Sequence, residues 1–404
     1  MKLAVLGTDS DAVSLVAAAV TAGHQIVWLG DVRPEDAAEV NRLLPGLGAS
    51  ADWESLLDHS LVDAVLVGRG TAGEVLRAEQ LKRLVADFMP VLAVHPVGTS
   101  VLLYYELDMA RHEVHGVLRH YSPLVDLPAV NTLAEWVQTG DGPIGAVHQI
   151  YVERPLIDCR RESVIRSLAR DVELLSRVAG GVRTVSAVGP RALDATYASL
   201  QVQMTSSGAA TLRWSLAPAT GVPRQAVIGL VGEVGIATLP LPDGTASITT
   251  NVGGNSEVLT AAPYDQPAAA IDTLAAVLPA NGTEQSEAAS TWQEATAAME
   301  IVDTIELSLQ KGRTIEVHQQ RLTEQLAFRG TMAAFGCGLL LVAFFALIAA
   351  GVLGDVLGVP LRDYWPITLL VVLAVFLSMQ ALPWLVKRRR RDSDAPNNRS
   401  SAAR

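Results

Sequence analysis

The sequence predicts an α/β domain on a parallel sheet, then an α+β domain on an open antiparallel sheet, then two transmembrane helices. Residues 1–121 alternate continuous apolar runs with helical spacings, which is typical of a parallel sheet covered on both faces. Residues 122–328 contain short strands joined by tight turns. Residues 329–391 contain two uncharged apolar stretches and end in a basic run.

The elements of the first domain follow from apolar spacing. Strands are expected at 2–7, 25–31, 62–68 and 89–96, and helices at 11–23, 34–44 and 72–88. Ser10 or Asp9 can cap the first helix, and Gly23 can end it. Ligands of such sheets bind at the carboxyl ends of the strands.

The second domain opens with two helices and continues as strands. Helices are expected near 127–139 and over 162–181, with a strand ending at Pro155 between them. Further strands are expected at 182–189, 195–205, 209–218, 224–241 and 245–252, followed by a helix over 290–312. This pattern predicts an antiparallel sheet with helices packed on one face.

The turn after the first strand keeps part of a Rossmann-like dinucleotide pattern. Gly7 stands at the first glycine of G-x-G-x-x-G, whereas Asp9 and Ala12 stand at the second and third. Asp31 ends the second strand, where an acidic residue holds an adenosine ribose. The alternative stays open that Gly7 serves only a turn and Asp31 only caps the next helix. A carboxylate at position 9 adds bulk and repels phosphate at the helix N-terminus.

The whole arrangement over 1–317 resembles the Gfo/Idh/MocA family of NAD(P)-dependent oxidoreductases. Its most specific stretches are 62–68, 227–241 and 298–317, which are similar to the family in spacing and residue type. The resemblance implies an NAD or NADP site in which Gly7, Thr8, Ser10 and Asp31 contact the cofactor, with weak affinity because of Asp9. It implies no metal.

The residues that carry the family's chemistry differ here. Its Glu-Lys-Pro motif reads Val94-His95-Pro96, and its Asp-x-Gly-x-His motif falls on Arg166, Leu168 and Arg170. Arg69 also intrudes at the exit of the strand at 62–68. Together these departures suggest that hydride transfer is lost. If activity remains, His95 and Arg170 are the catalytic candidates, because a histidine can act as a general acid or base near neutrality.

Other histidines and arginines admit two readings each. His95 can instead be a hydrogen-bonded histidine at a strand end. His112, His115 and His120 have no accompanying ligand set for a metal and are expected at the surface or between domains. Five arginines, Arg160, Arg161, Arg166, Arg170 and Arg177, suit either an anionic or sugar ligand or a salt-bridged helix with Glu162 and Glu173.

Two segments, 331–353 and 364–386, are each long and apolar enough to span a bilayer. The basic run 387–391 follows the second, so the hairpin within 329–391 is expected to place the soluble domains and a disordered tail, 392–404, in the cytoplasm. Two cysteines, Cys159 and Cys337, fit a reducing compartment. The net charge of -11 argues against nucleic acid.

Three functions are compatible with these features. The main hypothesis is a catalytically degenerate, membrane-anchored protein that senses a ligand or acts as a scaffold at the inner face of the cytoplasmic membrane. The first alternative is an active NAD(P)-dependent oxidoreductase acting on a sugar or inositol-type substrate through a non-standard site. The second alternative is a structural domain that forms a homodimer through the sheet of the second domain. Whether the chain is an enzyme stays open.

Overall fold

The computed structural model describes residues 1–190, 196–197, 199–208, 210–219, 225–241, 247–278 and 285–317. The predicted membrane hairpin at 329–391 and the tail at 392–404 lie outside these ranges. Within them, no helix combines the length and the apolar character that a membrane crossing requires. The described residues belong to one compact unit, Met1–Gln319. The domain boundary expected after residue 121 falls at the end of a strand and stays a prediction.

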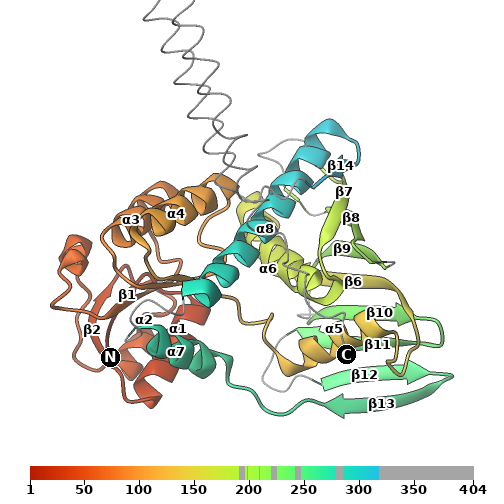
Figure 1. Ribbon diagram of the computed structural model, residues 1–404, viewed down its shortest axis with the longest axis horizontal. Helices are drawn as coiled ribbons and strands as arrows, with labels where there is room; N and C mark the ends of the chain where they lie inside the picture. Colours follow the sequence, from red (N-terminus) through yellow and green to blue (C-terminus); the bar gives the residue numbers. More distant parts are fainter. Residues whose placement is uncertain are drawn as a thin grey trace, which may run out of the picture. The chain divides into compact units, whose positions relative to one another are not determined.

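A five-stranded parallel sheet forms the first part of the chain, in the order β2-β1-β3-β4-β5 (Figure 1). Its strands are β1 (Lys2–Leu6), β2 (Gln25–Gly30), β3 (Ala64–Val67), β4 (Val91–Val94) and β5 (Leu118–Tyr121). Its helices are α1 (Ser10–Thr21), α2 (Ala37–Leu43), α3 (Glu74–Ala86) and α4 (Val101–Val114), with a short 3-10 helix at Trp53–Leu57. Every residue of β3 and β4 is buried, which explains their continuous apolar runs. The predicted Rossmann-like sheet is confirmed.

The chain order places a topological switch beside β1. Strand β2 lies on one side of β1 and β3 on the other, so the loops after these three strands meet at one edge of the sheet. Gly7, Asp31 and Gly68 follow the three strands directly. This edge is therefore where a dinucleotide would be sought.

A nine-stranded sheet follows, in the order β13-β12-β11-β10-β6-β9-β8-β7-β14. Its strands are β6 (Val147–Leu156), β7 (Val182–Val188), β8 (Gln201–Ser206), β9 (Thr211–Pro218), β10 (Ala226–Gly232), β11 (Gly235–Leu241), β12 (Ser247–Val252), β13 (Asn255–Thr260) and β14 (Ile315–Glu316). The expectation of a purely antiparallel sheet is wrong, because β6 and β9 pair in parallel. Parallel neighbours need a long crossover, and α6 (Arg161–Ala179) lies in the connection after β6.

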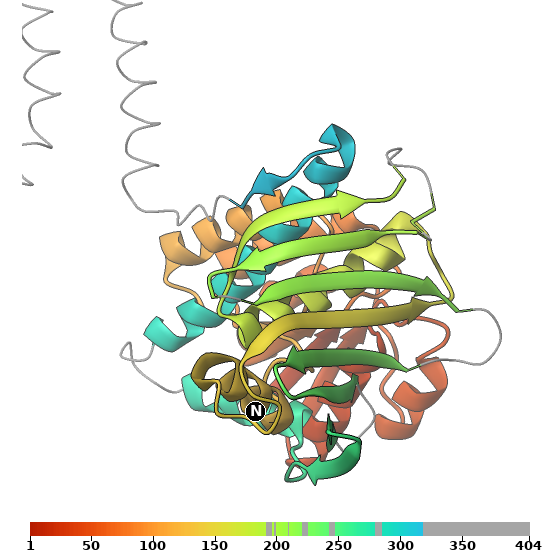
Figure 2. The same ribbon diagram turned by 90° about the vertical axis from the view of Figure 1, so that its right-hand side faces the viewer.

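Helices cover one face of this sheet, and its other face is open in Figure 2. The helices after β5 are α5 (Pro128–Thr139), α6, α7 (Gln266–Val277) and α8 (Gln285–Lys311), of which α7 packs against α1 of the parallel-sheet part. Helix α8 contacts α6 and β7 and also reaches α4 and β5, so it joins both sheets. The fully buried Trp292 of α8 stacks on Tyr104 of α4. Strand β13 and helix α7 are not expected from the sequence.

Candidate dinucleotide site

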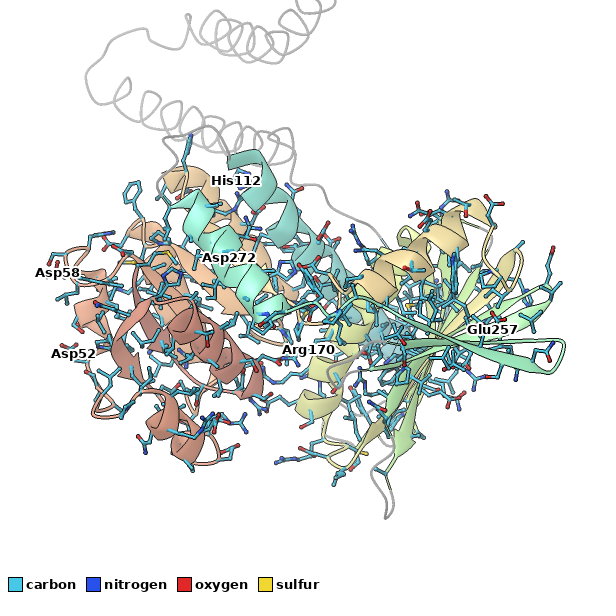
Figure 3. All side chains as sticks on the ribbon, turned by 90° about the horizontal axis from the view of Figure 1, so that it is seen from below. Asp52, Asp58, His112, Arg170, Glu257 and Asp272 are labelled. Atoms are coloured by element: carbon cyan, nitrogen blue, oxygen red, sulfur yellow. The ribbon has the colours of Figure 1, made fainter. Side chains whose placement is uncertain are left out.

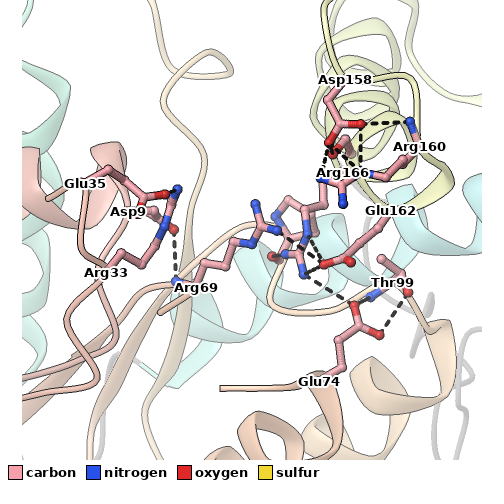
Figure 4. A network of polar contacts seen from close by, with 12 residues as sticks. Asp9, Arg33, Glu35, Arg69, Glu74, Thr99, Asp158, Arg160, Glu162 and Arg166 are labelled. Carbon is pink, nitrogen blue, oxygen red and sulfur yellow. Dashed lines mark hydrogen bonds and ion pairs between the residues drawn. The ribbon is translucent and has the colours of Figure 1, made fainter. Parts of the chain in front are cut away.

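The N-terminus of α1 is capped by the side chain at the second position of the glycine pattern. Asp9 Oδ1 accepts hydrogen bonds from the backbone N–H groups of Asp11 at 3.1 Å and Ala12 at 2.8 Å. Its Oδ2 accepts one from the N–H of Arg69 at 2.9 Å (Figure 4). These N–H groups are the donors that a helix N-terminus offers to a phosphate. Asp9 therefore holds, with its own carboxylate, the position at which an anion would bind.

Asp31, the expected ribose-binding residue, is likewise engaged within the chain. Its Oδ1 accepts from the N–H of Thr71 at 2.8 Å and from the Thr71 hydroxyl, and its Oδ2 from the N–H of Ala72 at 3.2 Å. Arg77 of α3 forms an ion pair with the same carboxylate. The loop from β3 to α3 thus crosses to the end of β2.

Arg77 is the residue that packs this loop onto the first turn. Its side chain is 3% exposed, and it donates to the carbonyl oxygens of Leu6 at 3.2 Å and Arg69 at 3.3 Å. A Cβ added at Gly7, whose φ is +84°, would lie 2.5 Å from Arg77 Nη2 and 2.7 Å from the carbonyl oxygen of Gly68. Gly7 is therefore needed both for its conformation and for this close approach.

The remaining residues predicted to contact a cofactor lie differently. The Thr8 hydroxyl is buried, where it accepts from the N–H of Arg33 at 2.9 Å and donates to Asp36 at 3.0 Å. It therefore holds the start of the α2 segment and does not face a ligand. Ser10 is exposed as the first residue of α1. Gly7, the α1 terminus and Asp31 stand at the positions that a dinucleotide requires. These groups can bind a dinucleotide only if the present contacts of Asp9, Arg77 and the β3–α3 loop are broken.

His95, at the end of β4, is fully buried and does not reach the α1 terminus. Its Nδ1 lies 3.2 Å from the Tyr104 hydroxyl, and its Nε2 lies 3.8 Å from a carboxylate oxygen of Glu173 on α6. Burial lowers the pKa of His95 to about 4, against the opposing effect of Glu173. The imidazole is therefore neutral at physiological pH. This environment matches the reading of a hydrogen-bonded histidine, and its catalytic role stays a prediction.

Glu173 joins His95 to His120 on the neighbouring strand β5. The other oxygen of Glu173 lies 2.5 Å from Nε2 of His120. Burial alone would raise the pKa of Glu173, but the two histidines lower it to about 2. Burial alone would lower the pKa of His120, but Glu173 raises it above its ordinary value. Each of the two groups therefore favours the charged form of the other inside the protein.

Arg170 and Arg166 on α6 reach toward the first domain. Figure 3 labels Arg170 where α6 faces the first part of the chain. Its Nε donates to the His95 carbonyl oxygen at 2.9 Å, and its Nη2 lies 2.5 Å from the Asp11 carboxylate. Arg166 lies 2.9 Å from Glu162 and 3.5 Å from Glu74. Arg170, which the resemblance aligns with an acid–base histidine, links α6 to the first turn of α1 in the structure.

All five arginines of this stretch have partners in the structure. They contact acidic or amide side chains: Arg160 with Asp158, Arg161 with Glu306, Arg166 with Glu162 and Glu74, Arg170 with Asp11, and Arg177 with Asn131. The prediction of a salt-bridged helix is thus confirmed for Glu162, which pairs with Arg166. It is wrong for Glu173, which pairs with the two histidines because it faces the interior.

The histidine triplet does not form a metal site. His112 and His115 are exposed near the end of α4, whereas His120 is buried on β5. Among the described residues, no three His, Cys, Asp or Glu side chains are arranged to hold a metal ion.

Comparisons with known proteins address the fold. Comparisons of the sequence with protein-family models and with curated proteins gave no match. KijD10, a 3-ketoreductase from Actinomadura kijaniata in complex with TDP-benzene and NADP, matches with a TM-score of 0.62 at 16% identity, over 76% of this chain and 97% of its own. An oxidoreductase from Agrobacterium radiobacter, in complex with NAD+, L-tartaric acid and magnesium, matches with a TM-score of 0.59 at 15% identity, over 78% and 98%.

A third structure is levoglucosan dehydrogenase in complex with NADH and L-sorbose. It matches with a TM-score of 0.61 at 14% identity, over 79% of this chain and 99% of its own. The chain has the fold of Gfo/Idh/MocA-type oxidoreductases. Similarity at these identities establishes the fold and leaves activity to be argued from the site.

Two residues that define this site are not singled out by the sequence. Arg77 reads as one more charged residue on the amphipathic helix α3, and its partner Asp31 is far from it in the chain. Glu173 reads as a surface partner for arginines. Only the folded arrangement shows that both are buried.

Proposed function

We propose that this chain is an NAD(P)-dependent oxidoreductase of sugar-type substrates whose dinucleotide site is closed, in this structure, by its own side chains. The fold comparisons favour this alternative over a degenerate module, because the matched oxidoreductases are covered over 97–99% of their length. The observation that carries the closed state is the pairing of Asp31 with Arg77, Thr71 and Ala72.

A nicotinamide dinucleotide, when bound, supplies the hydride donor or acceptor for the interconversion of an alcohol and a carbonyl. On this proposal Gly7 admits the backbone close to the cofactor, the α1 terminus receives its phosphates, and Asp31 receives its ribose. Arg170 and Arg166 hold α6 against the first domain and orient a ligand there. On binding, the α1 N–H groups would exchange their contacts with Asp9, and Asp31 its contacts with Arg77 and the β3–α3 loop, for contacts with the cofactor.

The second candidate is a non-catalytic ligand-sensing or scaffold protein. It is favoured by the burial of His95, whose neutral ring is fully shielded from a substrate, and by Arg170 in place of an acid–base histidine.

Titration of the purified full chain with NAD(H) and NADP(H) tests both candidates. Saturable binding, followed by nicotinamide absorbance changes with sugars or inositols, supports the oxidoreductase. Binding without turnover, or turnover that survives in His95→Ala and Arg170→Ala variants, removes the catalytic assignment of these two residues. The absence of binding to wild type and to an Arg77 variant supports the non-catalytic candidate.

We also propose, from the sequence alone, that 329–391 anchors the protein in the cytoplasmic membrane as a two-helix hairpin. The basic run 387–391 supports a cytoplasmic tail. A homodimer through the open face of the nine-stranded sheet is a further proposal, supported by the absence of helices on that face among the described residues (Figure 2).

A further inference from the structure

A second candidate site lies at the opposite edge of the parallel sheet. A cavity of about 100 Å³ lies between the end of β5, the first half of α7 and Glu294 of α8. Strand β5 is the far edge of the sheet, with β3 and β4 between it and β1. The cavity is therefore distinct from the dinucleotide site. It opens toward solvent, because Asp126 and Tyr264 in its wall are exposed.

Two buried nitrogen atoms in the wall have no hydrogen-bond partner. Nδ1 of His120 and Nε2 of Gln266 form no hydrogen bond with any group in the described part of the chain. The His120 side chain is 7% exposed and Gln266 is 9% exposed. A buried polar group without a partner carries an uncompensated desolvation cost. A ligand in the cavity that accepts hydrogen bonds from these groups would remove that cost.

The polar groups of the wall also determine which class of ligand can bind. The Nε2 side of His120 is held by Glu173 at 2.5 Å, which favours the imidazolium and makes Nδ1 a donor. The Gln266 amide is a donor as well, whereas Asp126 and Glu294 present carboxyl groups. The wall also contains Arg119, so an anion would meet the two carboxyl groups and an ammonium would meet the His120 ring and the Arg119 guanidinium. Hydroxyl groups both accept and donate, so a neutral polyhydroxy compound satisfies the whole wall.

The volume of the cavity limits the size of the ligand. A cavity of about 150 Å³ accepts a molecule of six carbon atoms, so this cavity takes roughly four to six non-hydrogen atoms. That is the size of a three-carbon polyol or of one end of a sugar. The rings of Tyr121 and Tyr264 line the same cavity and offer apolar faces to the C–H groups of such a compound.

We propose that this cavity binds vicinal hydroxyl groups of a small polyol or of one end of a sugar, with His120 and Gln266 as donors. This inference does not require a nicotinamide cofactor and stands independently of the proposed oxidoreductase activity.

The test uses the full chain without nucleotide and saturation-transfer NMR with four probes: glycerol, erythritol, propionate and 1-propanol. We expect transfer to glycerol and erythritol and little to the other two. Ala269→Leu narrows the cavity wall and should abolish the transfer, while Gln266→Met should weaken polyol binding five- to tenfold. Ala276→Leu, at an exposed position of the same helix, should leave binding unchanged.

Three results would overturn the proposal. The first is the absence of saturation transfer to either polyol, which would mean that the cavity holds only water. The second is transfer that persists in Ala269→Leu, and the third is equal or stronger transfer to propionate or 1-propanol. Thermal unfolding of each variant tests whether the variant is folded. If either the Gln266 or the Ala269 variant fails to fold, the other one still tests the proposal. Failure here leaves the nucleotide titration unaffected, so the two proposals fail separately.

Discussion

Replacing Arg77 by methionine should tighten the binding of NAD(H) or NADP(H). Arg77 pairs with Asp31 and holds the β3–α3 loop over Gly7, so the closed arrangement competes with the cofactor. A hydrogen bond to a charged group contributes about 1.5–3 kcal/mol. At about 1.4 kcal/mol per tenfold, loss of this contact shifts the balance toward the open site roughly 10- to 100-fold. The apparent Kd should fall by up to the same factor.

The same substitution should also lower the stability of the fold. Arg77 bonds two carbonyl oxygens, at 3.2 Å and 3.3 Å, and these lose their donor. Asp31 keeps the N–H groups of Thr71 and Ala72, so the free energy of unfolding should fall by about 2–3 kcal/mol. Calorimetry measures the affinity, and urea unfolding measures the stability.

Two control variants make the result interpretable. Arg83→Met changes an exposed arginine of the same helix, which pairs with Glu54, and should alter neither affinity nor stability by much. Arg77→Lys keeps the positive charge and should stay closer to wild type than Arg77→Met. The reasoning is refuted if folded Arg77→Met binds both dinucleotides no more tightly than wild type does.

Four further predictions concern the cap of α1, the buried histidines and the C-terminal segment. Asp9→Gly should strengthen dinucleotide binding roughly tenfold or more, because it frees the α1 amides and removes a charge beside the phosphates; unchanged affinity in calorimetry would mean that Asp9 is no obstacle. The free energy of unfolding should be greatest near pH 6.5. It should fall as pH decreases toward 4, because the unfolded chain then protonates His95 and the folded chain does not; it should also fall as pH increases, because the folded chain keeps the His120 proton that the unfolded chain loses. Glu173→Gln should remove the alkaline loss, because Glu173 dominates the raised pKa of His120 over Glu294 and Asp126; an unchanged alkaline limb in pH-dependent urea unfolding would contradict this. A reporter fused after Arg404 should read as cytoplasmic, and an external signal would disprove the hairpin topology.

The fold class could be predicted because both sheets leave strong periodic signals. The buried strands β3 and β4 require continuous apolar residues, and α1 has a cap and a terminal glycine in sequence. Strand β13 gave no such signal, because all six of its residues are exposed and no alternation develops. The parallel pairing of β6 with β9 is set by the α6 crossover, and strand alternation carries no information on the direction of a neighbour.

The candidate site could be predicted only in part. Gly7 and Asp31 are visible because they hold fixed positions relative to strand ends. The pattern could not show that Arg77 pairs with Asp31, since a long-range pair has no periodicity. The departure at Asp9 was visible both as a source of repulsion and as one of two possible caps of α1. That Asp9 and not Ser10 is the cap follows from the geometry of its hydrogen bonds.

Asp9 and Asp31 together relate the stability of this protein to its ligand binding. Asp9 accepts from the helix N–H groups that the phosphates of a dinucleotide would contact, and Asp31, the carboxylate expected to bind the ribose, is itself paired with the loop N–H groups and Arg77. A cap contributes about 0.5–2 kcal/mol, and a partly buried charge pair contributes more. Binding must therefore exceed these internal contributions before any affinity is observed. Substitutions that weaken the closed site should consequently raise affinity and lower stability together, and variants that separate the two effects would show that the carboxylates do not compete with a cofactor.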